Sequence, residues 1–440
     1  MVLKQWINPL LVGLLILFSI PLKLPALQQM LESLLSFSFP IRLSLYTLFL
    51  PPVALFCLAW NRKRKAEIWQ QLRFPLIVLA FLFIWMWLGA IMSEYPKIAL
   101  KHSGRYSIYL LTFLAFLFAL DRESSKKSGQ IFTGIYVLLM ALTFWDWHGQ
   151  TSIPGLLADN GLHIDLYFSS NHGIPSSFFE NRNPYSVISV AVFFWSLNGL
   201  RHSRILSSFG IGASLYSIVI AGSRNGILTM VLCFLFLLIL TFKQIRKART
   251  VFMLVLGAAI IVGIGYYSIQ SPTKNRTNAI LNRLLNVKTY KDLESLDLRF
   301  IIFRSALEFG IANPPILGSG TKTFGHEVIS KSNALRPYNN PYYKTRFNSH
   351  NAPLTIWIEM GWVGLIAVLI FLWLWFRPAL RGPPLLMMPM LAVCVGQILD
   401  YFVWEIFFMA FQSFFFASFA STIYFIEGKS TAQSSDNSDY

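Results

Sequence analysis

The sequence is divided into apolar stretches that are long enough to cross a lipid bilayer, and this pattern constrains the fold more than any other feature. Since a spanning helix needs about 20 apolar residues, the stretches predict about twelve transmembrane helices. They begin near Trp6, Ile41, Phe74, His102, Ile131, Pro184, Ile205, Gly226, Val251, Pro353, Pro383 and Val403. Charged residues make up only 13% of the chain, against roughly 25% in soluble domains. The predicted fold class is an all-α, polytopic integral membrane protein.

The basic residues between these stretches predict the orientation. Every second connection between the apolar stretches is short and basic. These connections lie at 62–65, 122–127, 201–204, 243–249 and 377–381. Because cytoplasmic loops are enriched in Lys and Arg, both termini are expected in the cytoplasm. The same rule accounts for much of the net charge of +17, so nucleic acid is not expected as a partner.

The predicted organisation has four parts. Residues 1–270 hold transmembrane helices 1–9, residues 271–352 form a large periplasmic loop, residues 353–426 hold helices 10–12, and residues 427–440 form a disordered cytoplasmic tail. The loop carries twelve basic and five acidic side chains, which favours an anionic ligand or attraction to anionic lipid head groups. Within it, Asn278–Val287 and Leu296–Phe309 are typical of interfacial helices that form a lid.

Three predicted helices begin at the outer face with polar motifs. The motifs are Asn181-Arg182-Asn183-Pro184, Gly222-Ser223-Arg224-Asn225-Gly226 and Asn348-Ser349-His350-Asn351-Ala352-Pro353. Helix capping accounts for the Asn and Pro residues, but it leaves Arg182, Arg224 and His350 unexplained. Free N–H groups at three helix starts favour a common anion site. Arg346, in the basic loop, is a further candidate for substrate binding.

Two arginines are the strongest candidates for an anion clamp. Arg224 at a helix start opposes the helix dipole, so it either reaches lipid phosphates or holds a phosphate ligand. Arg299 has no carboxylate three or four residues away in the sequence, whereas Arg304 precedes Glu308 by four residues and is expected to form an ordinary surface pair. We therefore select Arg299 and not Arg304.

The candidate base is His350, which lies between the basic loop and a helix start. A lone histidine is often structural, but an imidazole beside an anion site can take a proton from an attacking hydroxyl. Glu359, about two turns inside the next helix, is a second ionisable candidate that can instead pair within the bundle. Metal-binding motifs are absent from the sequence of the outer face, so neither a metal nor a cofactor is predicted.

These motifs together resemble the Wzy_C family of O-antigen ligases, O-antigen polymerases and pilin O-oligosaccharyltransferases. The similar pieces lie between about residues 180 and 370. They are Ser223-Arg224-Asn225-Gly226, Arg299 with Phe303, Pro315-Ile316-Leu317-Gly318-Ser319-Gly320 with Phe324, His350-Asn351 with Leu354, and Glu359-Met360-Gly361-Trp362-Val363-Gly364. Phe303 stands where a Trp is common, and Asn225 where a small residue is expected.

The resemblance implies a GT-C-like glycosyltransferase bundle in a bacterial inner membrane, with its active site facing the periplasm. The implied donor is an O-antigen glycan on undecaprenyl diphosphate, and the implied acceptor is a sugar hydroxyl of lipid A–core. Transfer would be metal-independent and inverting. His350 would act as the base, Arg224 and Arg299 would hold the diphosphate, and the substrate-binding candidates would be Arg182, Asn183, Asn351 and Arg346.

Other readings stay open at this point. A polymerase would use a second lipid-linked glycan as acceptor, and a pilin O-oligosaccharyltransferase would use a Ser or Thr. A transporter or flippase is a different class, but such proteins usually contain two similar halves, and we find no internal repeat. A covalent glycosyl-enzyme would need a carboxylate nucleophile, which the sequence of the outer face does not clearly offer.

Overall fold

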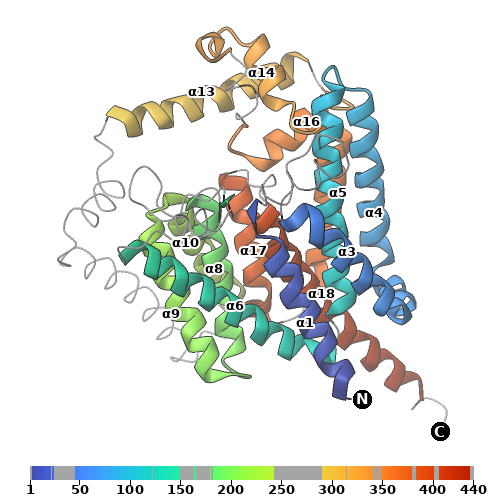
Figure 1. Cartoon of the computed structure of the whole chain (residues 1–440). Helices are drawn as coiled ribbons and strands as arrows, with labels where there is room; N and C mark the ends of the chain where they lie inside the picture. The colour runs from blue at the N-terminus through green and yellow to red at the C-terminus, as the bar shows by residue number, and fades with distance from the viewer. Residues whose placement is uncertain are drawn as a thin grey trace, which may run out of the picture.

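The computed structural model shows a bundle of helices with a helical cap (Figure 1). It describes residues 2–20, 22–23, 45–120, 122–148, 163–164, 179, 182–241, 290–313, 315–339, 344, 348–378, 383–400 and 406–436. The bundle helices are α1 (Val2–Phe18), α3 (Leu45–Trp60), α4 (Lys65–Ile91), α5 (Pro96–Ala119), α6 (Arg122–His148), α8 (Arg182–Gly199), α9 (Arg204–Ala221), α10 (Arg224–Thr241), α16 (Ala352–Phe376), α17 (Pro384–Leu399) and α18 (Ile406–Asp436). A two-residue antiparallel ladder joins β1 (Leu22–Lys23) to β2 (His163–Ile164).

Every predicted spanning segment coincides with a described helix except the one near Val251, which lies outside the described residues. Among the described helices, five are long and apolar enough to cross a membrane, namely α4, α6, α9, α10 and α16. Shorter apolar helices are found in α1, α3, α17 and α18. The membrane-protein class follows from these helices, whereas the count of twelve crossings stays a prediction.

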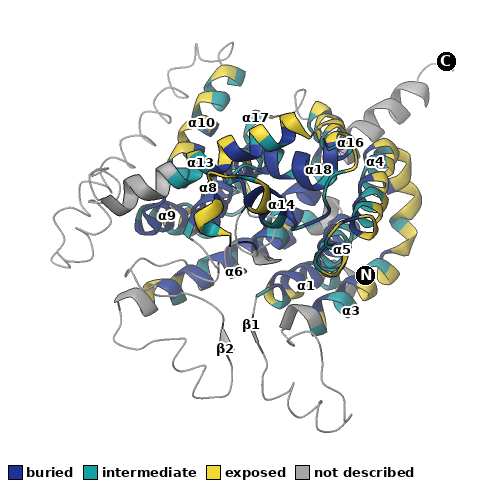
Figure 2. Ribbon diagram, turned by 90° about the horizontal axis from the view of Figure 1, so that it is seen from above, coloured by how far each residue is buried: buried dark blue, intermediate teal, exposed yellow. Residues whose placement is uncertain are grey.

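Helix α8 lies near the centre of the bundle, where its residues are mostly buried (Figure 2). It packs against α9, α10 and α17 through small side chains. A Cβ at Gly226 of α10 would lie 2.4 Å from the hydroxyl of Ser186, and one at Gly396 of α17 would lie 2.4 Å from Val187. Small residues let helix backbones approach closely, as is common in membrane bundles. This packing brings the first turns of α8 and α10 beside the last turn of α17.

The cap consists of α13 (Tyr290–Ala312), α14 (Phe324–Lys331) and the short 3-10 turn Arg336–Tyr338. Figure 1 shows α13 lying across one end of the bundle. The predicted helix Leu296–Phe309 is confirmed as part of α13, while Asn278–Val287 lies outside the described residues. An apolar cluster that includes Ile302, Val328 and Trp357 joins α13, α14 and α16. Burial of these side chains fixes the cap on the bundle.

At the C-terminus, α18 continues to Asp436. The structure therefore extends the helix through residues 427–436, for which the sequence predicts a disordered tail. No proline follows Gly428 in this segment, so nothing in its composition stops a helix from continuing.

Candidate active site

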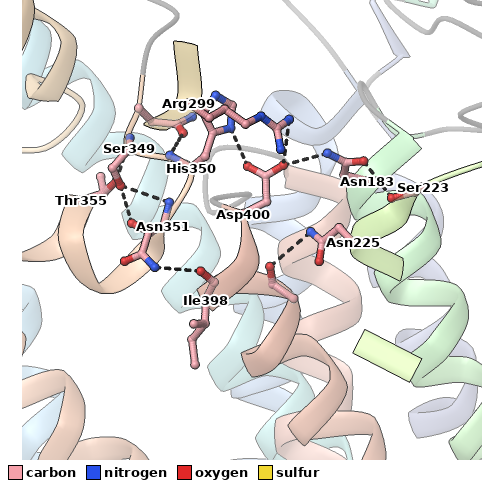
Figure 3. Close-up of polar contacts among 12 residues, drawn as sticks. Asn183, Ser223, Asn225, Arg299, Ser349, His350, Asn351, Thr355, Ile398 and Asp400 are labelled. Carbon is pink, nitrogen blue, oxygen red and sulfur yellow. Dashed lines mark hydrogen bonds and ion pairs between the residues drawn. The ribbon is translucent and has the colours of Figure 1, made fainter. Parts of the chain in front are cut away.

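The centre of the site is Asp400, which directly follows α17 (Figure 3). Its side chain is only 5% exposed. One carboxylate oxygen, Oδ1, lies 2.9 Å from Nδ1 of His350. The other, Oδ2, accepts a 2.8 Å hydrogen bond from Nδ2 of Asn183 and lies 3.9 Å from Nη2 of Arg299. Three residues that the sequence predicts as site residues thus contact the carboxylate of Asp400, which the sequence analysis does not predict as a site residue.

Asn183 is buried on the first turn of α8, and its neighbours fix its amide orientation. The hydroxyl of Ser223, just before α10, donates to Oδ1 of Asn183 at 2.8 Å. The amide nitrogen is therefore directed at Asp400, because only that nitrogen can donate to a carboxylate. The starts of α8 and α10 are coupled to the end of α17 through this chain of hydrogen bonds.

His350 is held at the start of α16 by a tight turn. Its φ of 51° lies in the left-handed region, which is uncommon for a residue with a side chain. The Oδ1 atom of Asn348 accepts the His350 backbone N–H at 2.8 Å, and the hydroxyls of Ser349 and Thr355 are 2.7 Å apart. These contacts maintain the strained backbone and direct the imidazole toward Asp400.

The contact with Asp400 assigns the two nitrogens of His350. An ionised carboxylate only accepts hydrogen bonds, so in the neutral imidazole Nδ1 carries the proton and Nε2 carries the lone pair. The imidazole side chain is 31% exposed, which leaves it open to a substrate. A histidine oriented in this way can serve as a general base.

Burial and hydrogen bonding act in opposite directions on Asp400. Burial raises the pKa of its carboxyl, but the hydrogen bond from His350, the charges of His350 and Arg299, and the bond from Asn183 outweigh it, and the net pKa lies below its ordinary value. Asp400 is therefore ionised at neutral pH. It can stabilise positive charge on His350 after proton transfer.

Arg299 reaches the site from α13 in the cap. Its side chain is 40% exposed, so the guanidinium has donors available for a further anion while it faces Asp400. Arg304, one and a half turns further along α13, pairs with Glu308 at 2.7 Å, and both side chains are exposed. The predicted surface pair of Arg304 with Glu308 is confirmed, whereas anion binding by Arg299 stays a prediction.

The remaining candidates lie at the edges of this network. Arg182 is the first residue of α8 and is half-buried, and Arg224 is the first residue of α10 and is exposed. Their chain neighbours Asn183 and Ser223 belong to the Asp400 network, so both arginines are at the same end of the bundle. Arg346 lies outside the described residues.

The side chain of Asn351 has a structural role. As the N-cap of α16 it accepts the Leu354 backbone N–H at 2.9 Å through Oδ1, and its Nδ2 donates to the carbonyl of Ile398 at 2.9 Å. Both polar atoms of its side chain are engaged by the backbone. The contacts account for Asn351 as a link between α16 and the end of α17, a role that needs no glycan.

Sequence reasoning missed Asp400. It is the first acidic residue after Glu359, and it ends an apolar stretch that begins at Pro383. An ionisable group at such a position is a functional candidate by default, and that signal could have identified it. The expectation that no carboxylate nucleophile is clearly offered stays a prediction. Because both oxygens of Asp400 are engaged and the side chain is buried, the geometry favours an orienting role over a nucleophilic one.

The two glycine-containing motifs of the sequence interlock beside the site. The backbone N–H groups of Ser319 and Gly320 donate to the carbonyls of Ile358 and Glu359, each at 2.9 Å, and Trp362 N–H donates to Pro315 at 2.9 Å. These contacts cross a kink in α16 at Gly361. The motifs therefore join the cap to α16 and are structural in this arrangement.

Glu359 also belongs to this junction. Its buried carboxylate accepts the backbone N–H of Phe324 at 3.3 Å, at the first turn of α14. A carboxylate at this position complements the positive end of the α14 dipole. Of the described residues, no group of three or more His, Cys, Asp or Glu side chains has an arrangement that could hold a metal ion.

Comparison with known proteins agrees with the resemblance seen in the motifs. A family model described as O-Antigen ligase, Wzy_C, matches residues 209–369, which contain Arg224, Arg299 and His350. No curated protein matches the chain. The family includes ligases and polymerases, which are glycosyltransferase-like enzymes. Residues 209–369 therefore match an O-antigen ligase domain, and this match supports membership of the O-antigen ligase and polymerase family.

Proposed function

We propose that this protein is an O-antigen ligase that transfers a glycan from undecaprenyl diphosphate to a sugar hydroxyl of lipid A–core. The observation that carries the proposal is the 2.9 Å contact between His350 Nδ1 and Asp400 Oδ1, with Arg299 beside the same carboxylate. It combines an oriented base with a cation, and both His350 and Arg299 lie within the residues that the family model matches.

In the proposed reaction, Nε2 of His350 takes the proton of the acceptor hydroxyl as its oxygen attacks the anomeric carbon. The bond between that carbon and the diphosphate oxygen breaks, and the diphosphate leaves with the electron pair. Asp400 stabilises the imidazolium that forms, as a buried carboxylate does for a catalytic histidine. Arg299 and Arg224 stabilise the negative charge on the leaving group. Direct displacement of this kind inverts the anomeric centre.

An apolar cavity supports a lipid-linked substrate. The cavity, of about 290 Å³, lies between α4, α5, α16 and α18, and it is lined by residues such as Leu82, Met86, Phe113 and Phe416. Gln412, also in its wall, accepts a 3.3 Å hydrogen bond from Gln397, one turn before Asp400 on α17. A hydrocarbon chain in this cavity would therefore end close to the proposed base.

The polymerase and the pilin O-oligosaccharyltransferase share the proposed donor chemistry and differ in acceptor. The site residues described above act on the glycan donor and on the transferred proton. The same His350 and Arg299 would therefore serve either reaction. Glycosyl transfer requires deprotonation of an acceptor hydroxyl, which substrate transport does not, and the His350–Asp400 pair beside Arg299 therefore favours an enzyme.

The test uses purified full-length protein in detergent with undecaprenyl-diphosphate glycan, lipid A–core and EDTA. Core-linked product made by wild type, and not by His350→Ala, supports a metal-independent ligase. Glycan that lengthens on its own lipid instead identifies a polymerase. Product on pilin alone identifies an O-oligosaccharyltransferase. If none of these products forms from a competent donor, the proposed glycosyl transfer is wrong.

A further inference from the structure

A second cavity, with mostly polar lining residues, lies at the end of the bundle opposite His350. Helix α8 connects the two places, because Asn183 contacts the site at its first turn and Asn198 lines the cavity at its last turn. The cavity volume of about 440 Å³ is within the range of small-molecule sites. Most of its lining residues are polar, and they include Ser125, Lys126, Gln130, Asn198, His202 and Ser203.

The charges of this cavity favour an anion. Lys126 provides a positive charge at its wall and His202 a ring nitrogen, while the described lining residues include no carboxylate. Arg204, the first residue of α9, directly follows the lining residue Ser203 in the sequence. Several hydroxyl and amide donors next to a lysine are suited to the oxygens of a phosphate.

Two hydroxyl groups in this region are not committed to the fold. Ser203 occupies the N-cap position of α9, yet its side chain makes no capping hydrogen bond. Ser196 is 1% exposed, and its hydroxyl has no hydrogen-bond partner in the described structure. A Cβ atom at Gly210 would lie within 2.9 Å of both Ser196 Oγ and the side chain of Thr133. Since Thr133 lines the cavity, Ser196 lies close to the cavity wall. Ser196 is not itself a lining residue, but it follows the lining residue Trp195, and a buried hydroxyl without a partner is costly and favours a polar group in the neighbouring cavity.

We propose that this cavity binds a phosphate ester, separately from the proposed transferase site. Lys126 pairs with the phosphate, and Ser203, Gln130 and Asn198 donate to its oxygens. The phosphate can be carried by an anionic phospholipid or by a soluble compound, since both present the same group. The helix ends and basic residues around the cavity are typical of the head-group region of a membrane leaflet.

The experiment compares two adjacent lysines. Lys126 lines the cavity, whereas the ammonium of Lys127 lies 4.4 Å from the centre of the Trp6 ring. Wild type, Lys126→Ala and Lys127→Ala are purified in a neutral detergent with lipid removed. Binding of phosphatidylglycerol, phosphatidylcholine and glycerol 3-phosphate is titrated by native mass spectrometry and by the shift of the unfolding temperature. Ser203→Ala, which removes one of the proposed donors without removing a capping hydrogen bond, is tested as a second variant.

We expect saturable binding of phosphatidylglycerol or of glycerol 3-phosphate to wild type and to Lys127→Ala, and about tenfold weaker binding to Lys126→Ala. Binding of the lipid alone assigns a lipid head group, and binding of both probes assigns a general phosphate site. Equal affinity in the two lysine variants, equal affinity for phosphatidylcholine, or no saturable binding would each overturn the proposal. If Lys126→Ala cannot be purified, unchanged affinity in Ser203→Ala overturns it.

Discussion

The Asp400 carboxylate lies between a base and a cation, and its negative charge serves both. It orients His350 through Nδ1 and faces Arg299 through its other oxygen. Replacement by asparagine keeps the size of the side chain but offers one acceptor oxygen and an amide donor. The His350 ring would then lose the partner that favours the Nε2 lone pair.

We therefore predict that Asp400→Asn lowers the rate of glycan transfer by about 10²- to 10⁴-fold, the range seen when a histidine loses its carboxylate partner. The measurement is product formation at saturating donor and acceptor. Asn351→Ala is the control, because Asn351 contacts only the backbone in the hydrogen bonds described above, and its loss should reduce stability more than turnover. A rate for Asp400→Asn within about threefold of wild type contradicts an orienting role.

The lowered pKa of Asp400 also predicts the sign of a pH effect on stability. A carboxyl with a pKa lower in the folded state than in the unfolded chain stabilises the fold above the unfolded value of about 3.9, and this stabilisation is lost as the pH falls through the folded value. The difference in unfolding temperature between wild type and Asp400→Asn should thus be largest near neutral pH and vanish in strong acid. A difference that grows as the pH falls would contradict the assignment.

Arginine geometry gives the third prediction at the residue scale. Arg299→Lys keeps the charge but loses the planar pair of donors, so transfer should fall about tenfold or more through weaker use of the donor. Arg304→Lys, on the same helix, changes only an exposed pair with Glu308 and should stay within about twofold of wild type. Donor titrations of both variants provide the measurement. Equal effects at the two positions would place the loss in the fold of α13 and not in anion binding.

Among the elements, the kink of α16 depends on Gly361, with a φ of 70°. A Cβ there would lie 2.1 Å from the carbonyl oxygen of Ile316. Gly361→Ala should therefore strain the backbone by about 1–3 kcal/mol and separate the cap from α16. Gly104→Ala is the matched control, since nothing lies within 4 Å of its Cβ position and alanine favours the helix.

The two glycine variants are compared by unfolding temperature and by the rate at which a protease cuts between α13 and α14. We expect Gly361→Ala to unfold at a lower temperature and to be cut faster, with Gly104→Ala matching or exceeding wild type. Arg299 belongs to the cap, so transfer should fall in Gly361→Ala even where the bundle remains folded. Wild-type stability and proteolysis in Gly361→Ala would show that the junction does not hold the cap.

Helices with strong local signals could be predicted from the sequence, and contacts between distant segments could not. The apolar run of α16 and its Asn351 cap are local patterns. The Leu296–Phe309 helix is also recognisable locally, from the apolar residues that it contains. Asp400 joins Asn183 across more than 200 residues, and only helix packing through Gly226 and Gly396 brings them together. The α14 helix has only eight residues, too few to give a clear periodic signal.

At the scale of the whole molecule, the two ends of the helix bundle carry different polar groups. The His350 network lies under the cap, and the polar cavity with Lys126 lies at the opposite end of α8. A helix of 18 residues rises about 27 Å, close to the thickness of the hydrocarbon core. This separation supports the proposal that the two polar regions face opposite sides of one membrane, with the base on the periplasmic side.

The orientation can be tested with single cysteines at the two ends. Arg304 in the cap and Arg201 between α8 and α9 are both exposed, while Cys57 and Cys233 are buried and Cys394 can be replaced by alanine. In cells whose outer membrane is permeabilised, an impermeant maleimide should label Arg304→Cys at once. It should label Arg201→Cys only after the inner membrane is disrupted. The opposite order would invert the topology, and a base facing the cytoplasm could not use a glycan acceptor in the periplasm.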